Sequence, residues 1–266
     1  MIPSVLLAAL AVAGALAWRT GRRQAAALSL DHGELALPGL PAALAGLRLL
    51  HLSDLHLSRR SHLAPLLHLL ASAQPDLVVI TGDLAGGRGG SERARAFLEA
   101  AAPYPCYCCP GNADYVKDAG RVADFAAWRA TGARVLINQA QPLPGLPAWI
   151  AGVDDPHRRR DDLAATLAGV PPGAFLVLLA HSPDIILRPP AARAGVIFCG
   201  HTHGGQVCLP GGWPPYRHAR VPRRFASGLH RLQAGVLVVS RGVGVTRLPL
   251  RLFCPPQATL WRLVSA

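Results

Sequence analysis

The sequence predicts an α/β protein in which two packed β-sheets carry helices on their outer faces, behind an apolar N-terminal helix. Apolar runs alternate with helical stretches in the first half of the chain, and strand-like runs dominate the second half. The body shows no internal repeat and no linker that would divide it in two. Of the 266 residues, 51% are hydrophobic and 16% charged, which argues against disorder and supplies a large core.

Residues 1–23 are expected to form a membrane anchor with a basic flank. Residues 2–18 are uncharged and almost wholly apolar, which is the short limit for crossing a bilayer, and three arginines follow at once. By the positive-inside rule these arginines favour a single-pass anchor in the inner membrane with a cytoplasmic domain. A cleaved signal peptide is the alternative, because residues 15–17 resemble a cleavage site, although a basic segment before the apolar run is missing.

Residues 24–45 are expected to be a connector with one edge strand and a turn at Pro38 and Pro41, before the main domain of residues 46–266. In the first half of that domain strands and helices alternate, and Ser91 is expected to cap the second helix. The predicted strands are residues 47–52, 76–80 and 106–109, and the predicted helices are 63–72, 91–101 and 121–130. In the second half, strands are predicted at residues 148–153, 175–180, 195–199, 235–240 and 258–263.

Neither the net charge nor the cysteine content identifies a binding partner. A formal charge of +12 suggests an anionic partner, but almost every base is arginine, which together with abundant alanine is also what GC-rich coding would produce. No basic run is long enough for a tail, and nucleic acid is not favoured as a partner. The six cysteines lack CxxC spacing and are interpreted as reduced, structural residues.

Polar residues follow directly after five of the apolar runs, where α/β folds place their ligand sites. Each short motif is weak alone, but together they supply only oxygen and imidazole ligands. The strongest is a strand ending in His-x-His followed by two glycines, because residues i and i+2 of an extended segment point the same way. The seven candidate metal ligands are Asp54, His56, Asp83, Asn112, His181, His201 and His203.

Seven ligands are too many for one tetrahedral ion and suit two ions that share a carboxylate. Mixed nitrogen and oxygen ligands favour Mn²⁺, Zn²⁺ or Fe²⁺ over Ca²⁺, and the lack of thiolates argues against a structural zinc site. The reaction implied is metal-assisted hydrolysis of a phosphoester or a pyrophosphate.

The order Asp-x-His, Gly-Asp, Gly-Asn, His and Gly-His-x-His resembles the calcineurin-like metallophosphoesterase superfamily, from about residue 47 to residue 263. The stretches GHTHGGQ, SRGVG and LPLRLFCPP are similar to its membrane-anchored bacterial branch, which includes cell-wall-associated phosphodiesterases and a UDP-2,3-diacylglucosamine pyrophosphatase of lipid A biosynthesis. The resemblance implies a four-layer α/β/β/α sandwich of mixed sheets and a binuclear centre, with Mn²⁺ the first choice. It assigns Asp54, His56 and His203 to one ion, Asn112, His181 and His201 to the other, and Asp83 to both.

Ala113 departs from the family pattern, in which the residue after the metal-binding Asn is usually a histidine. The resemblance therefore implies that no side chain acts as the catalytic group and that a metal-held hydroxide attacks. General acid catalysis contributes about 10² to 10⁴-fold, so the change costs most for a poor leaving group. A soluble family of UDP-diacylglucosamine pyrophosphatases is similar in lacking this histidine. Ala113 thus favours a pyrophosphate or another activated ester.

Several further residues have two interpretations. Arg59, next to Arg60, either binds substrate phosphate or is solvated. The loop 154–160 is either a rim for an anionic substrate or ordinary surface charge. The segment 211–224 mixes aromatic and basic residues, which suits a membrane interface and also nucleic acid. Asp114 is expected to hydrogen-bond the loop behind Asn112.

The favoured function is a membrane-bound binuclear hydrolase of phosphoesters or pyrophosphates, acting on a lipid-linked nucleotide sugar such as UDP-2,3-diacylglucosamine. One alternative is an exported phosphodiesterase of envelope polymers or nucleotides, which gains if the N-terminus is cleaved. Another is a catalytically silent metal-binding scaffold that uses its basic surface to bind lipid or a partner.

Overall fold

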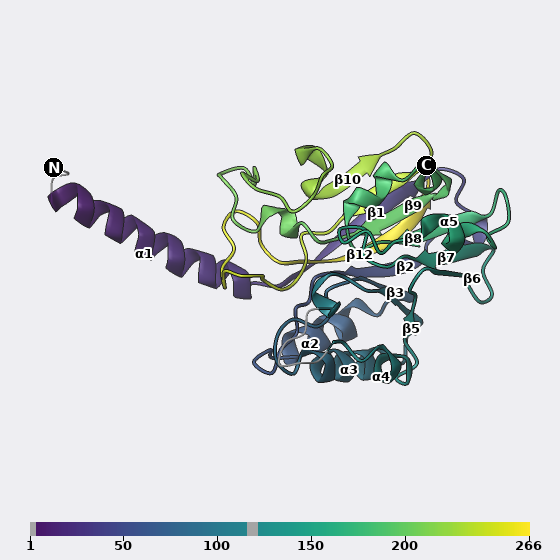
Figure 1. Cartoon of the computed structure of the whole chain (residues 1–266), viewed down its shortest axis with the longest axis horizontal. Coiled ribbons are helices and arrows are strands. Elements are labelled where there is room, and N and C mark those ends of the chain that lie inside the picture. The colour runs from purple at the N-terminus through teal and green to yellow at the C-terminus, as the bar shows by residue number, and fades with distance from the viewer. Residues whose placement is uncertain (1–3, 116–121) are drawn as a thin grey trace.

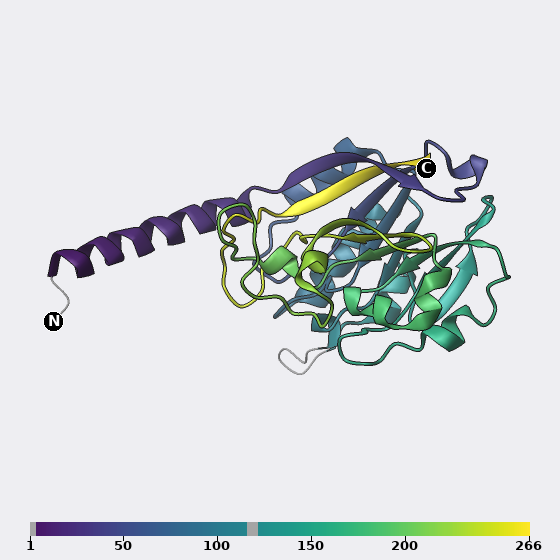
Figure 2. The same ribbon diagram turned by 90° about the horizontal axis from the view of Figure 1, so that it is seen from above.

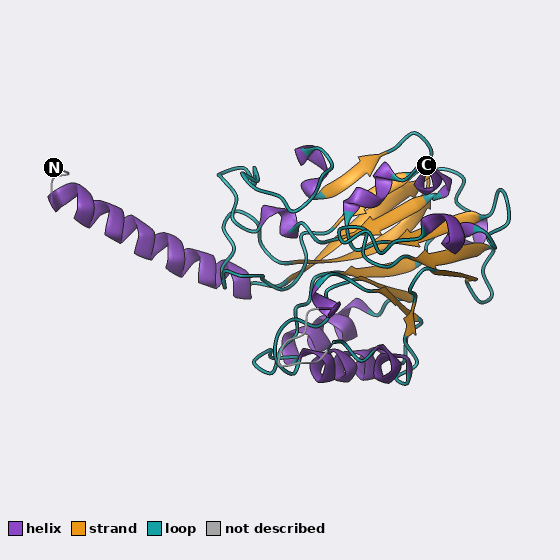
Figure 3. Ribbon diagram, viewed as in Figure 1, coloured by secondary structure: helices purple, strands orange, loops and turns teal. Residues whose placement is uncertain are grey.

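Two six-stranded mixed sheets pack face to face with helices on their outer faces in the computed structural model, which describes residues 4–115 and 122–266 (Figure 1; Figure 3). Buried residues form three clusters: one between the sheets and one beneath each helical layer. The predicted four-layer α/β/β/α sandwich is therefore confirmed.

The first sheet has the strand order β1-β12-β2-β3-β4-β5. The strands from β2 to β5 are parallel, β12 runs antiparallel to β2, and β1 lies at the edge, parallel to β12. Helices cover its outer face, as Figure 1 shows. The elements are β1 (Ser29–Leu37), β2 (Arg48–Leu52), β3 (Leu77–Thr81), β4 (Cys106–Cys109), β5 (Arg134–Val135), β12 (Gln257–Ser265), α2 (Ala64–Ala73), α3 (Gly90–Ala101) and α4 (Phe125–Arg129).

The second sheet has the order β10-β11-β9-β8-β7-β6, with its four central strands parallel and both edge strands antiparallel. The short helix α5 (Leu163–Leu167) and several 3₁₀ turns cover its outer face. The strands are β6 (Gln139–Pro142), β7 (Ala148–Gly152), β8 (Phe175–Leu179), β9 (Val196–Cys199), β10 (Gly228–Arg231) and β11 (Val236–Val239).

The central strands are apolar along their whole length because both of their faces are covered. In β3, Val79 points into the core between the sheets, whereas Val78 and Ile80 point to the helical layer. Strand β1 at the edge alternates between exposed and buried positions instead. Parallel strands with buried faces bring their carboxyl ends, and the loops that follow, to one edge of the sandwich.

Helix α1 (Ser4–Ala26) projects away from the sandwich and contacts the body near its C-terminal end (Figure 1; Figure 2). The carbonyl of Gly21 accepts a hydrogen bond from the backbone N–H of Arg251 at 3.0 Å, and Gly21 packs on Leu250. The expected N-terminal helix is present. Within residues 4–115 and 122–266, no helix combines the length and the apolar character that crossing a membrane requires.

All of the predicted strands are present, and the predicted helices are present within a few residues, except that α4 is shortened to Phe125–Arg129. Residue 121, where that helix was expected to begin, lies outside the described residues. The expected cap at Ser91 is wrong. Gly89 precedes helix α3 without a side-chain cap, and the Ser91 hydroxyl accepts a hydrogen bond from the N–H of Asp124 at 2.9 Å.

Candidate metal centre

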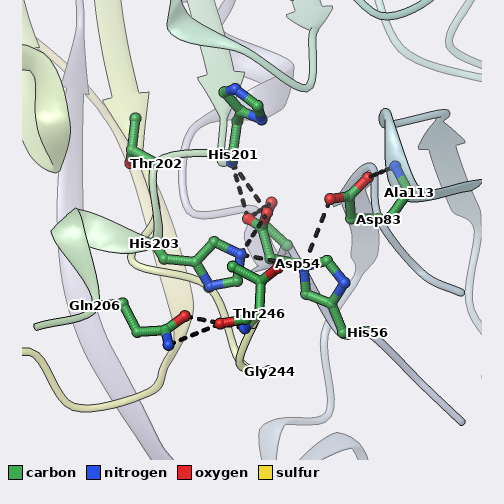
Figure 4. A network of polar contacts seen from close by, with 12 residues as sticks. Asp54, His56, Asp83, Ala113, His201, Thr202, His203, Gln206, Gly244 and Thr246 are labelled. Carbon is green, nitrogen blue, oxygen red and sulfur yellow. Dashed lines mark hydrogen bonds and ion pairs between the residues drawn. The ribbon is translucent and has the colours of Figure 1, made fainter. Parts of the chain in front are cut away.

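The seven residues predicted as metal ligands follow five strand ends at one edge of the two sheets. Figure 4 shows Asp54, His56, Asp83, His201 and His203 facing one another. Five of them have left-handed backbones, which cost about 1–3 kcal/mol each for residues other than glycine. Such conformations persist only where the surrounding structure holds them, and they gather at functional sites. These residues, with φ between 45° and 70°, are Asp54, His56, Asp83, His201 and His203.

The first group consists of Asp54, His56 and His203, whose ligand atoms lie within 4.8 Å of one another. The Nε2 atoms of His56 and His203 are 3.1 Å apart, and His203 Nε2 is 3.4 Å from Oδ1 of Asp54. Two ligands at right angles around an ion about 2.0–2.2 Å away stand about 2.8–3.1 Å apart. The spacing of the two imidazoles therefore suits a shared divalent ion.

The second group contains His181 and His201 beside Asp83. Nε2 of His181 lies 3.1 Å from Nδ1 of His201 and 3.4 Å from Oδ2 of Asp83. The same Oδ2 is 3.5 Å from His56 Nε2 in the first group. One carboxylate oxygen thus faces ligands of both groups, which is the position that a bridging carboxylate requires.

Asn112 offers a direct test of whether a cation fits. Its side-chain oxygen is buried and has no hydrogen-bond partner among the described residues. A buried acceptor left unpaired costs about 1–3 kcal/mol. A divalent ion would satisfy this oxygen, and the neighbouring carboxylates and imidazoles complete a suitable donor set.

Hydrogen bonds behind the ligands fix their orientation. Nδ1 of His181 lies 2.8 Å from the carbonyl of Thr81, so it carries the ring proton and leaves Nε2 free for a ligand bond. The Ser53 hydroxyl donates to Oδ2 of Asp54 at 2.6 Å. The backbone N–H of His201 donates to both oxygens of the same carboxylate.

Asp114 connects the turn that contains Asn112 to the turn that follows β3, as expected. Its carboxylate accepts the backbone N–H groups of Asp83, Gly111 and Ala85, each at 2.9 Å. Burial and the charge of Asp83 raise the pKa of Asp114 to about 7.

The electrostatics of the centre favour a positive charge. Burial alone would raise the pKa of Asp83, but His181 and His56 hold it well below its usual value. Burial would lower the pKa of His181, yet Asp83 and Asp54 raise it to about 10. In the metal-free protein the imidazole of His181 is therefore protonated at both nitrogens and positively charged beside these carboxylates. Burial, with the neighbouring His181, keeps the pKa of His201 well below its usual value, so this ring stays neutral as a metal ligand requires.

Arg251 is a residue of the site that the sequence reasoning missed. Its guanidinium is fully buried and stands 3.2 Å from Nδ1 of His203. It donates to five backbone carbonyls of the surrounding loops, those of His203, Arg241, Gly242, Gly244 and Cys254. The one signal available was a single arginine inside the apolar stretch LPLRLFCPP, which implies a buried charge with backbone partners.

Arg59 lies outside the metal-ligand cluster, in a cavity of about 1260 Å³ that reaches Ala113. Its side chain packs across Gly89, at the start of α3. Three more arginines line the cavity, Arg88, Arg93 and Arg95.

Comparison with known proteins places the chain among metallophosphoesterases. Residues 47–205 match the model of the calcineurin-like phosphoesterase family. Bacillus subtilis YkuE, a metallophosphoesterase, is 30% identical over 85% of this chain and 82% of its own length. The UDP-2,3-diacylglucosamine pyrophosphatase LpxG of Chlamydia trachomatis is 27% identical over 85% of this chain and 86% of its own. The phosphodiesterase YaeI of Escherichia coli is 29% identical over 82% of each.

Proposed function

Because the chain belongs to the calcineurin-like phosphoesterase family, we propose that it is a binuclear hydrolase of phosphoesters or phosphoanhydrides. The observation that carries this proposal is the pair of ligand groups joined by Oδ2 of Asp83. In this arrangement Asp54, His56 and His203 would hold one divalent ion, Asn112, His181 and His201 would hold the other, and Asp83 would be shared.

Two divalent cations, with Mn²⁺ the first choice and Zn²⁺ or Fe²⁺ as alternatives, supply Lewis-acid activation of water and of the phosphoryl oxygens. The protein's part is to orient the ligands. The hydrogen bond from His181 to the carbonyl of Thr81 orients His181, and the hydroxyl of Ser53 orients Asp54. The guanidinium of Arg251 donates to the carbonyls of the loops around His203.

The surroundings of Ala113 favour a substrate with a good leaving group. Its methyl group cannot donate a proton, and its backbone N–H is already used by Oδ1 of Asp83 at 2.7 Å (Figure 4). A phosphate monoester departs without protonation, whereas an alkoxide does not. We therefore favour cleavage of a pyrophosphate or an activated ester over that of a simple phosphomonoester.

The arginine-lined cavity beside Ala113 suits a substrate that extends from the cleaved bond with further negative charge. A lipid-linked nucleotide sugar of the type of UDP-2,3-diacylglucosamine meets this requirement. The similarity to LpxG supports the choice, and Arg59 is the residue we assign to a substrate phosphate.

A collar of exposed apolar side chains, Leu209, Trp213, Leu248 and Phe253, lies on loops beside the point where α1 leaves the body. Leu209 and Trp213 are 52% and 46% exposed, and Leu248 and Phe253 are 51% and 52% exposed. The segments that carry them are joined by the Val207–Leu252 and Leu209–Trp213 bridges, next to Leu250 and its contact with Gly21. Exposed apolar patches of this kind mark interaction sites.

We propose that this collar and α1 hold the domain at the cytoplasmic surface of the inner membrane. Leu6, Leu10 and Leu16 of α1 are each about half exposed, so the helix offers apolar surface to lipid. Arg223 stacks on Trp213 at 4.2 Å, which combines an aromatic ring with a cation as the headgroup region favours.

The proposal is tested by loading the full chain with Mn²⁺ and assaying bis-p-nitrophenyl phosphate beside UDP-2,3-diacylglucosamine. We expect turnover of both substrates, and its loss in Asp83→Asn. Turnover of the diester alone, with an N-terminus that mass spectrometry shows to be cleaved, would favour the exported phosphodiesterase. Bound metal without turnover of any activated ester would favour a silent scaffold and refute the hydrolase.

A further inference from the structure

Two imidazoles that are not among the candidate ligands stand beside His201. The ring centroid of His157 lies 4.4 Å from that of His201, and the centroid of His218 lies 6.1 Å from it. The rings of His157 and His218 are 6.5 Å apart. The three rings come from separate loops, so their convergence is a product of the fold and not of sequence proximity.

The loop that carries His157 is held by hydrogen bonds and by a ring contact. Asp155 is fully buried, and its carboxylate accepts the backbone N–H groups of His157 at 2.9 Å and of Arg158 at 3.1 Å. Arg160 places its guanidinium over the ring of Tyr115 at 3.9 Å. These contacts fasten the loop to the turn that contains Ala113.

The loop that carries His218 is held by a second buried carboxylate. Oδ1 of Asp184 accepts the backbone N–H groups of Arg220 at 2.7 Å and of Val221 at 3.1 Å. The guanidinium of Arg217 donates to the carbonyl of Val221 at 2.9 Å. Neither imidazole is therefore carried by a loosely attached surface loop.

His201 itself has an unused polar atom at this place. His201 is 7% exposed as a whole residue. Its Nδ1 faces His181, while its Nε2 is buried without a hydrogen-bond partner among the described residues. A buried N–H left unpaired is costly, which points to a ligand that is bound there in the working protein.

We propose that His157 and His218, with Nε2 of His201, form an imidazole-lined subsite that donates hydrogen bonds to phosphoryl oxygens of the substrate. The inference rests on the proposed function for the identity of the anion. Ala113 has neither a polar side chain nor a free backbone N–H, so donors to the phosphoryl group must come from another part of the site. Neutral imidazole donates through one ring nitrogen, and this suffices for the contact.

The experiment measures the affinity of the Mn²⁺-loaded full chain for inorganic phosphate by calorimetry. The variants are His157→Ala, His218→Ala and the double variant, with His157→Gln as a conservative change that keeps an N–H donor. His68→Ala is the matched control, because His68 is an exposed histidine on α2, away from the site. Metal content and thermal unfolding are recorded for every variant.

We expect each alanine variant to weaken phosphate binding about tenfold or more, as loss of a hydrogen bond to a charged group predicts. His157→Gln should recover part of the loss, and His68→Ala should bind as the parent does. Unchanged affinity in the double variant, with the metal content intact, would overturn the subsite, as would failure of the metal-loaded parent to bind phosphate. Weaker binding in the variants of a protein that hydrolyses no ester would retain the subsite and refute the hydrolase.

Discussion

The backbone N–H of Ala113 donates to Oδ1 of Asp83 over 2.7 Å, while the other oxygen of that carboxylate faces His56 and His181. One aspartate thus connects the candidate metal ligands to the backbone of residue 113. The chain holds this carboxylate in place with a peptide group, and the side chain at residue 113 plays no part in the contact.

Replacing Ala113 with histidine should raise activity on esters that have poor leaving groups. An added imidazole can donate a proton to an alkoxide, and general acid catalysis provides about 10² to 10⁴-fold at best. Turnover of an alkyl phosphodiester and of bis-p-nitrophenyl phosphate would be compared, with Ala113→Leu as the control for size. An equal change on both substrates would contradict the argument.

Replacing Arg251 with methionine should destabilise the protein strongly. The variant removes one donor from five backbone carbonyls. Those of His203 and Gly242 still accept the N–H groups of Gln206 and Gln257, but those of Arg241, Gly244 and Cys254 lose their donor. A buried polar group left unpaired costs about 1–3 kcal/mol. We expect a loss of about 3 kcal/mol or more in urea unfolding, together with weaker metal binding through His203.

Arg262→Met is the matched control for that variant. Arg262 forms an exposed pair with Glu34 at 3.8 Å, and such pairs contribute about 0–1 kcal/mol. Equal destabilisation by the two variants would show that Arg251 has no special structural role.

Replacing Arg59 with alanine should raise the KM for a nucleotide diphosphate substrate about tenfold and leave the metal content unchanged, because a contact between a cation and a phosphate is lost. Its neighbour Arg60 is exposed and does not line the cavity, so Arg60→Ala controls for net charge. Steady-state kinetics of the two variants would measure this difference. The same KM in both would show that Arg59 is a solvated surface residue that does not bind the substrate.

The cysteines should resist alkylation in the native protein. All six are free and buried, and burial raises the pKa of Cys106 to about 12. Since the thiolate is the reactive form, only about one thiol in ten thousand is ionised at pH 8 with such a pKa. Labelling with iodoacetamide, followed by mass spectrometry, should be slow without urea and fast in urea. Rapid labelling of the native protein would contradict the assigned burial.

The sequence predicted the sandwich and the convergence of the candidate ligands because both follow from short-range patterns. Apolar runs mark the buried parallel strands, and Asp54, Asp83 and His201 follow directly after such runs. Loop packing is different. Arg251, His157 and His218 reach the site through hydrogen bonds and ring contacts between segments far apart in the chain.

Short elements also escaped prediction. Strand β5 has only two residues, too few for a pattern to emerge. Strand β10 has four residues, as β4, β9 and β11 do, but it is mostly exposed and lacks the continuous apolar run that predicted those three. The position of Ser91 suggested a helix cap, but the hydroxyl instead pairs with Asp124, a partner 33 residues away in sequence. Local sequence could not show that competing partner.

The binuclear centre is tested most directly by the number of divalent ions bound per chain, measured by elemental analysis after loading with Mn²⁺ and removal of free metal. We predict two ions in the parent chain and fewer in Asp83→Asn, because that substitution weakens the shared ligand. A parent chain that retains no transition ion under any loading condition would contradict it.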